Sequence, residues 1–363
     1  MSDNDEVIYA NLTLTSANPN ADIYSPATGE IAYTSPILNK CNDFICILSR
    51  FTIDTFSVPL LVPSLLKGQT DPNKTSYCFA LGYNGTYSDP IYVEYITSDF
   101  SAPVPSYNGQ SQNLSSNYYY IYDYATFLAM WNNAMITALA NLNAKVVTGA
   151  TQAPVFYFDP SVGVTLKAPT ANYQKTFNNT PDADKIQIYF NGMLAPLVQS
   201  LRSIFLPNVT NCNYCFILQD SGNNIVDNNY INAMENIQQL CYWQSLTSVQ
   251  IQTNMPVVPE FTQGVLNSNQ NQSQFNSILT DFQPDLSNPF GYNTSLNFNQ
   301  VSSLRIINLI GEQPMYNLSC SVFWTDTNNN RYPIYLSYGQ TVSIKFEFMK
   351  KSLYRGIIEH VKK

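Results

Sequence analysis

The strand-like segment near the end of the chain alternates between apolar and polar residues without a break. Val342, Ile344, Phe346 and Phe348 fall on one face, and polar or charged residues from Thr341 to Glu347 fall on the other. A period of two is typical of a β-strand with one face in a core and the other toward water. The residues before it, from 322 onward, indicate a strand, a turn, a short strand and a second turn. This region therefore predicts a half-buried antiparallel sheet, and two lysines follow it directly.

Short strands separated by turn residues are predicted along most of the chain. Apolar residues alternate in "EVIYANLTLT", and "DFICILSRFTI" is apolar on both faces, as expected for the central strand of a sandwich. The segment "APVFYFDPSVGVTLKAP" predicts a hairpin, and "KIQIYFNG" predicts a further strand. Many short strands with turn punctuation favour a β-sandwich or a jelly roll.

Two stretches in the middle of the chain have helical rather than strand periodicity. Between Asp123 and Leu142, large apolar residues recur on one helical face: Phe127, Trp131, Met135, Ala138 and Leu142. A second, shorter helix is predicted from Leu194 to Phe205.

The helical stretches lie between two strand-rich flanks. We therefore expect residues 1–70 and 241–363 to form one discontinuous jelly-roll domain, and residues 71–240 to form an inserted domain. The predicted fold class is mainly β: a single jelly-roll β-sandwich with an inserted β-rich domain that contains one or two helices.

The chain is acidic but carries few charges of either sign. Charged residues make up 12% of it, whereas about 25% is usual in soluble domains. Disorder does not explain this composition, because 45% of the residues are hydrophobic and 13% are aromatic. A surface poor in Lys and Glu and rich in Tyr is typical of an interface. We therefore expect other protein to cover much of this surface.

The residues needed for enzyme catalysis are scarce. His360, the only histidine, lies in a basic tail, and a Ser-His-Asp or Cys-His arrangement would have to use it. Cys212 and Cys215 have the spacing of half a zinc site, but no second pair exists. The chain also has no phosphate-binding glycine motif. The sequence therefore predicts no enzyme, no catalytic residue, no cofactor and no bound metal.

The first residues contain no basic and apolar signal region, and no apolar run approaches the length of a membrane span. We therefore expect a cytosolic product whose seven cysteines are reduced and mostly buried. Five tyrosines cluster between residues 118 and 124. Packing at an edge of the inserted domain or between subunits is the favoured interpretation, and a platform for stacking sugar rings is the alternative.

The end of the chain is basic, in contrast to the net charge of −8 for the whole. From Lys345 to Lys363 there are six basic and two acidic residues, so this segment carries a net charge of +4. A solvated end is one interpretation. The other is contact with a partner or with the interior of an assembly, by charge rather than base sequence. The candidate residues for such contacts are Lys350, Lys351, Arg355, Lys362 and Lys363.

Four passages, in order along the chain, together resemble the penton (vertex) capsid proteins of virophages and polinton-like viruses. They are "ILSRFTIDTFSVPLLVPSL", "APVFYFDPSVGVTLKAP" with "KIQIYFNGMLAPL", "WQSLTSVQIQTNMPVVPE" with "ILTDFQPD", and the segment from "LRIINLIGEQ" to "FMKKSLY". The resemblance implies a jelly roll with an insert and homopentamers that close icosahedral vertices. It offers no catalytic residues to carry over.

The resemblance also implies where the protein works and what it contacts. It would be made in the host cell cytoplasm and reside in the virion, at the capsid vertices. The expected partners are further copies of the chain and the major capsid protein, together with minor capsid proteins or packaged nucleic acid through the tail.

Two other functions share the predicted fold. A host-attachment spike or glycan-binding β-sandwich module would have the same tyrosine richness, and a trimer would favour it. A hexon-type major capsid protein with two jelly rolls usually needs a longer chain. Fold alone does not separate these functions.

Overall fold

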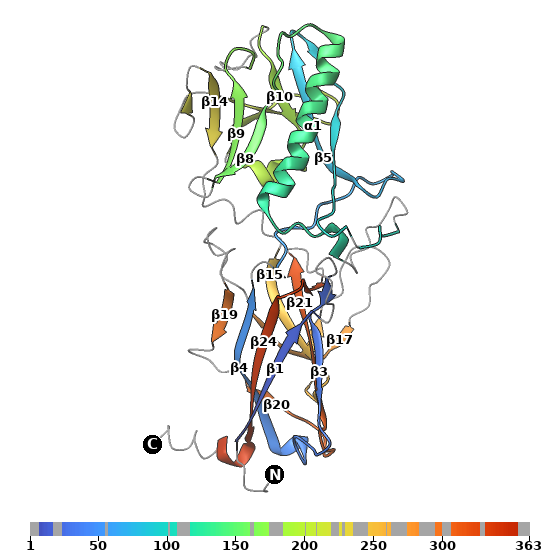
Figure 1. Cartoon of the computed structure of the whole chain (residues 1–363), viewed down its shortest axis with the longest axis vertical. Coiled ribbons are helices and arrows are strands. Elements are labelled where there is room, and N and C mark those ends of the chain that lie inside the picture. Colours follow the sequence, from blue (N-terminus) through green and yellow to red (C-terminus); the bar gives the residue numbers. More distant parts are fainter. Residues whose placement is uncertain are drawn as a thin grey trace.

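The computed structural model is an elongated molecule with two lobes stacked along its long axis (Figure 1). We call them the lower lobe, which contains β1, β4 and β24, and the upper lobe, which contains α1, β5 and β9. The structure describes residues 7–16, 24–54, 57–100, 102–106, 117–159, 163–173, 184–199, 201–207, 209–218, 225–226, 229–234, 246–258, 260–262, 274–282, 295–299, 306–326 and 331–354.

The first sheet of the lower lobe is antiparallel and joins strands from distant parts of the chain. Its order is β1, β24, β4 and then β19 and β20, which pair with different ends of β4. The strands are β1 (Val7–Thr15), β24 (Thr341–Lys350), β4 (Phe44–Asp54), β19 (Ser295–Asn299) and β20 (Ile306–Asn308). β4 is a central strand, as predicted.

The second sheet of the lower lobe has the order β18, β15, β21, with β22 and β3 on different parts of β21. Its strands are β18 (Ile278–Phe282), β15 (Leu246–Thr253), β21 (Asn317–Asp326), β22 (Arg331–Pro333) and β3 (Thr28–Ala32). Smaller elements of this lobe are β2 (Ser25–Pro26), β23 (Tyr335–Leu336), β16 (Glu260–Thr262), β17 (Gln274–Asn276) and the 3₁₀ turn η1 (Cys41–Asp43).

The chain passes repeatedly from one of these sheets to the other. β1, β4, β19 and β24 belong to the first sheet, whereas β3, β15, β18 and β21 belong to the second. This antiparallel interleaving is the connectivity of a jelly roll. The predicted fold class is therefore confirmed.

The core of the lower lobe lies between the two sheets. Val342, Ile344, Phe346 and Phe348 of β24 are fully buried, which confirms the predicted inward face. The second sheet contributes Trp324, among other residues. Burial of each large apolar side chain contributes about 1.5–3 kcal/mol to folding. The alternation of β24 therefore places four such contributions on one strand.

The upper lobe contains two sheets. The first has the order β11, β12, β10, β5, β6, with β7 also on β5, and the second has the order β13, β14, β9, β8. The strands are β5 (Lys74–Tyr83), β6 (Thr86–Tyr87), β7 (Ile91–Glu94), β8 (Val155–Asp159), β9 (Gly163–Pro169), β10 (Gln187–Phe190), β11 (Ser203–Phe205), β12 (Tyr214–Phe216), β13 (Ile225–Val226) and β14 (Tyr230–Met234). β8 and β9 pair as predicted.

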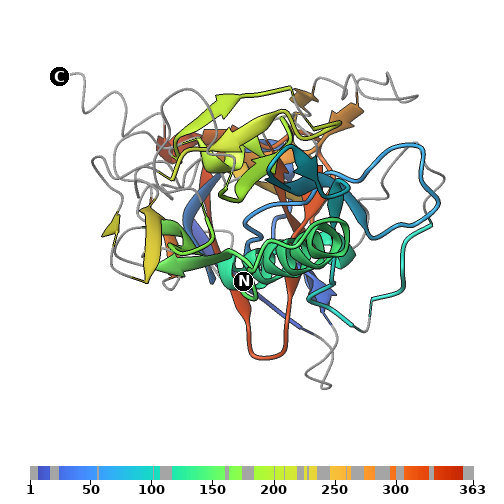
Figure 2. The ribbon, with the colours of Figure 1, turned by 90° about the horizontal axis from the view of Figure 1, so that it is seen from above.

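One long helix, α1 (Tyr124–Lys145), packs against β5, β7 and β8. Seen along the long axis, it lies along one side of the upper lobe (Figure 2). Asp123 caps its first turn, because a carboxylate oxygen accepts a hydrogen bond from the Thr126 N–H at 2.6 Å. On its buried face, the Trp131 ring meets those of Phe79 and Phe156 edge-on. The predicted helix is confirmed and extends to Lys145.

The second predicted helix, from Leu194 to Phe205, is wrong. Among the described residues of this stretch, only the 3₁₀ turn η4 (Ala195–Val198) is helical, and the chain then enters the strand β11. Pro196 at the start of the turn has no N–H to donate. Ile204 and its neighbours instead pair with β12, opposite Cys215. Sheet pairing with a distant segment therefore overrides the local helical spacing.

η3 (Asn117–Tyr119) leads into α1, and residues 351–354 after β24 are helical. Across the described part of the chain, no helix is long and apolar enough to span a membrane. The predicted domain boundaries at residues 70/71 and 240/241 stay a prediction.

Phe51→Ala is expected to lower the free energy of unfolding by about 3–5 kcal/mol, because it leaves a cavity in the core. Phe51 is fully buried in β4, opposite Ile344 of β24 and Phe298 of β19. Chemical denaturation followed by fluorescence measures the change. Tyr338→Ala is the matched control, because Tyr338 is 61% exposed and should change stability by less than about 0.5 kcal/mol. Equal effects of the two substitutions would contradict this account of the core.

Candidate functional site

The two lobes meet at an aromatic cluster centred on Tyr120. Its ring lies 5.8 Å from Trp324, 6.2 Å from Tyr332 and 5.9 Å from Tyr335, measured between ring centroids, and all three contacts are edge-on. The Tyr120 hydroxyl donates to the Pro333 carbonyl oxygen at 2.9 Å. Burial raises the pKa of Tyr120, so the hydroxyl stays a neutral donor. This cluster anchors the upper lobe to the second sheet of the lower lobe.

Backbone hydrogen bonds reinforce the junction. The Leu60 N–H donates to the Ile121 carbonyl oxygen at 2.7 Å, and the Ile121 N–H donates to the Leu61 carbonyl oxygen at 3.0 Å. These bonds tie the segment after β4 to the segment before α1. The junction is therefore held by paired backbone as well as by packed rings.

Tyr118, Tyr119 and Tyr124 are also buried within the chain, and Tyr122 is half-buried. Tyr118 donates to Asn73 Oδ1 at 2.8 Å, and Tyr119 donates to the Pro72 carbonyl oxygen at 2.9 Å. A sugar ring or a second subunit cannot stack on rings that are already covered. The favoured prediction, packing at an edge of the inserted domain, agrees with this position at the junction of the lobes, whereas the sugar platform is wrong for the buried rings. The cluster packs inside the chain because its rings are apolar and the hydroxyls of Tyr118, Tyr119 and Tyr120 each reach an internal acceptor.

The basic residues after β24 begin at the end of the lower lobe that lies farthest from the upper lobe (Figure 1). The Lys351 Nζ atom donates to the carbonyl oxygens of Asn42 at 2.7 Å and Leu309 at 3.2 Å. Lys350 is the last residue of β24 and pairs with Phe44. Arg355, Lys362 and Lys363 lie outside the described residues, as does His360. A partner contact through these basic residues stays a prediction.

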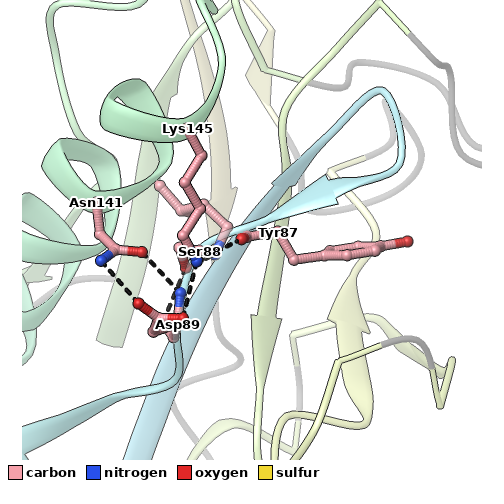
Figure 3. A network of polar contacts seen from close by, with 6 residues as sticks. Tyr87, Ser88, Asp89, Asn141 and Lys145 are labelled. Atoms are coloured by element: carbon pink, nitrogen blue, oxygen red, sulfur yellow. Dashed lines mark hydrogen bonds and ion pairs between the residues drawn. The ribbon is translucent and has the colours of Figure 1, made fainter.

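A network of polar contacts joins the end of α1 to the segment between β6 and β7 (Figure 3). Lys145 Nζ lies 2.8 Å from Asp89 Oδ1, and Asn141 Nδ2 donates to Asp89 Oδ2 at 3.0 Å. The Asp89 N–H in turn donates to Asn141 Oδ1 at 2.7 Å. Lys145 also donates to the Tyr87 carbonyl oxygen at 3.1 Å.

This network positions the end of α1 and has no feature of a catalytic site. The hydrogen bonds from Lys145 and then Asn141 lower the pKa of the Asp89 carboxyl. Lys145 also places a cation at the negative end of the helix dipole. The ion pair and the hydrogen bonds fix the end of α1 against the segment between β6 and β7, on a part of the surface that faces water.

The described cysteines are all buried: Cys41, Cys46, Cys78, Cys212, Cys215 and Cys320. The interpretation of Cys215 as a core residue is confirmed, since it is 1% exposed in β12. Burial raises its pKa to about 12, so it remains a thiol at neutral pH. In the described parts of the chain, no group of three or more His, Cys, Asp or Glu side chains could hold a metal ion.

Comparison with known proteins identifies relatives among virophage capsid proteins. The family model for the Sputnik minor capsid protein V18/19 matches residues 8–350. Protein V18 of Sputnik virophage is 36% identical over 144 residues, which cover 38% of this chain and 84% of V18. Structural protein V19 of the same virophage is 27% identical over 215 residues, which cover 56% of this chain and 96% of V19.

Two solved structures are similar over nearly the whole chain. A chain of the Sputnik virophage cryo-EM structure at 3.5 Å resolution matches with a TM-score of 0.78 and 29% identity, covering 96% of this chain and 99% of that one. A crystal structure of the mavirus penton protein matches with a TM-score of 0.59 and 18% identity, covering 95% of this chain and 99% of that one. The second likeness shows the fold alone.

Asp89→Asn is expected to lower the melting temperature slightly at neutral pH and to have no effect at strongly acidic pH. The pKa of Asp89 is lowered from its ordinary 3.8 in the folded state. Its contribution to stability is therefore present above pH 3.8 and is lost as the pH falls through the lower, folded-state pKa. Thermal melts of both proteins across this pH range measure the difference.

The exposed Glu312 in the lower lobe provides the control as Glu312→Gln. Because Asp89 faces water, high salt should also reduce the difference between wild type and Asp89→Asn. A difference that is independent of pH and salt would contradict an electrostatic role for Asp89.

Proposed function

The chain belongs to the family of the Sputnik minor capsid protein V18/19 and is a structural capsid protein, and we propose that it forms the homopentamers that close the icosahedral vertices of its particle. The resemblance to virophage capsid proteins, inferred from four sequence passages, is thereby confirmed. The relatives are capsid proteins rather than enzymes, which also confirms the prediction that the chain is not an enzyme.

The observation that supports the penton role is the fold match to the mavirus penton protein over 95% of this chain, including both lobes. A single jelly roll with an elaborated upper lobe is thus common to a known vertex protein and to this chain. A ring of identical subunits uses the same heterologous contact five times, which closes the assembly.

The proposed domain layout is a jelly-roll domain of residues 1–70 and 241–363, with residues 71–240 inserted. The strand pairing supports it, because the upper-lobe sheets are built from strands between Lys74 and Met234. The sheets of the lower lobe use strands that end by Asp54 or begin at Leu246. In this proposal the inserted domain forms the outward or lateral part of the vertex.

The surface composition supports assembly through contacts that depend little on charge. Several large apolar side chains are exposed, and contacts that they make with another subunit would not be screened by ions. They include Tyr9, Tyr33, Phe100, Val147 and Tyr338. Further copies of the chain and the major capsid protein are the partners that we propose for this surface.

The basic tail is proposed to face the particle interior. β1 and β24 pair from Val7 opposite Met349 onward, so the tail leaves from the lobe end that points away from the inserted domain. A basic segment there would contact packaged nucleic acid or an acidic minor capsid protein by charge alone. We propose synthesis in the host cell cytoplasm and residence at the capsid vertices.

The alternative, a glycan-binding module, is less well supported, because the tyrosines that would stack on sugar rings are mostly buried. A host-attachment spike would more often be trimeric, so subunit number separates it from a penton.

Purified protein is expected to form pentamers whose population changes little between low and high salt. Contacts made by apolar and hydrogen-bonding groups are hardly screened by ions, whereas contacts between charges are. Mass photometry at both salt concentrations measures the subunit number directly. A stable trimer would contradict the penton role, and a monomer at every concentration would count against self-assembly without partners.

Truncation after Ser352 is expected to leave the fold intact and to reduce incorporation into particles. The cut keeps Lys350 and Lys351 with its bonds to the lower lobe, and it removes Arg355, Lys362 and Lys363. Thermal melting tests the fold, and co-expression with the major capsid protein followed by gradient purification tests incorporation.

A full-length variant with Gln at the three removed basic positions separates charge from length. If charge drives the contact, this variant should be incorporated as poorly as the truncated chain. Normal incorporation of both would show that the tail is a solvated end with no role in assembly.

A further inference from the structure

A second, small apolar cluster lies in the upper lobe, apart from the main core, and half of its buried residues are cysteines. Its members are Cys78, Ala80, Tyr189, Val209, Cys212 and Cys215. Phe79, between Cys78 and Ala80 on β5, points the other way and packs on Trp131 of α1. Because side chains alternate along a strand, the cysteine cluster lies on the opposite face of this sheet from α1.

Two of the thiols in this cluster are in direct contact. Cys78 Sγ lies 3.0 Å from Cys212 Sγ, although the residues are 134 positions apart in the sequence. The two sulfur atoms need to approach by only about 1 Å to reach the length of a disulfide bond. Cys78 Sγ also lies 3.6 Å from the carbonyl oxygen of Asn211.

The loop before β12 holds Cys212 in this position. The Cys212 N–H donates to the Val209 carbonyl oxygen at 3.1 Å, and the Leu206 N–H donates to the Asn213 carbonyl oxygen at 2.7 Å. Asn211 adopts a left-handed backbone conformation, with φ of 68°, which Asn tolerates better than most residues. The contact between the sulfurs is thus built into a hydrogen-bonded turn on one side and a central strand on the other.

We propose that Cys78 and Cys212 are a disulfide-forming pair, reduced in the newly made chain and joined when the protein meets a low-molecular-weight disulfide such as oxidised glutathione. The inference concerns the upper lobe alone and holds for a monomer or a pentamer. Cys215, three residues after Cys212, lies in the same cluster and is not a member of the pair.

The reaction is a two-step thiol–disulfide exchange. The Cys212 thiolate attacks one sulfur of oxidised glutathione, which forms a mixed disulfide and releases one glutathione thiolate. The Cys78 thiolate then attacks the Cys212 sulfur and releases the second glutathione. The two protein thiols lose two protons and two electrons in total, and the oxidised glutathione gains them and becomes two glutathione thiols.

The closed structure makes this reaction slow. The contact with Cys78 and then burial raise the pKa of Cys212, so few thiolates exist until the loop opens. The loop lies at the surface, however, because Thr210 and Asn211 just before Cys212 are exposed. A local opening of this turn is enough to admit the oxidant, without unfolding of the sheet beneath it.

The disulfide would close a loop that spans α1 and most strands of the upper lobe, between β5 and the turn before β12. A cross-link that joins distant residues restricts the unfolded chain, and the effect grows with the length of the loop. The bond would therefore stabilise the folded upper lobe. It would do so at a cluster that is too small to contribute much through apolar burial.

The test compares protein purified in a reducing agent with the same protein after incubation with oxidised glutathione. Peptide mass spectrometry without reduction is expected to show a Cys78–Cys212 cross-link that lacks two hydrogen atoms relative to the separate peptides. Alkylation after denaturation should label two fewer of the seven cysteines. The melting temperature of the oxidised form should be higher than that of the reduced form by about 5 °C.

Cys78→Ala and Cys212→Ala should abolish the rise, whereas Cys215→Ala, the matched control in the same cluster, should retain it. If one alanine variant does not fold, the peptide map of the wild type still decides the matter. The proposal is overturned if oxidised, folded protein keeps Cys78 and Cys212 free. A Cys212–Cys215 bond, or a glutathione left on either member of the pair, would overturn it as well.

Discussion

The pairing of β24 with both β1 and β4 is the constraint on which the lower lobe depends. Val342 lies beside Leu14 on one side and beside Ile53 on the other, so residues from both ends of the chain meet in one sheet. The inward face of that sheet is complete only when β24 is in place. Such long-range pairing pays its loop-closure entropy before any contact is made, so the lobe is expected to close late in folding.

The same pairing determines how the upper lobe can be attached. The chain leaves the first sheet at the end of β4 and re-enters the second sheet at β15, and everything between them must begin and end near one edge of the sandwich. The aromatic cluster around Tyr120 lies at this edge. Its contacts to Trp324, Tyr332 and Tyr335 use residues of β21, β22 and β23, so the junction depends on strands from the C-terminal part of the lower lobe.

The sequence predicted the elements whose periodicity is set by a single buried face. β24 and α1 belong to this group, because each repeats its apolar residues on one face over at least seven positions. The second helix was wrong because the partner of Ile204 is a separate strand, β12, and no local pattern reports it. The partner of the tyrosine cluster could not be predicted for the same reason: its main contact, Trp324, lies about two hundred positions away. The contact of Cys78 with Cys212 also crosses most of the upper lobe, and neither residue carries a spacing signal for it.

The scarcity of charge has a consequence for how the two lobes are held together. The junction is made of rings, hydroxyl-to-carbonyl bonds and paired backbone, whereas the ion pair between Asp89 and Lys145 lies on the surface of the upper lobe. Salt and strong acid act on the second kind of contact and leave the first largely unchanged. An elongated protein that works within a larger assembly benefits from this division, because its internal geometry does not vary with the ionic conditions around it. The cysteine pair would extend the same logic to the upper lobe, since a disulfide bond is insensitive to salt and responds only to the redox state of its surroundings.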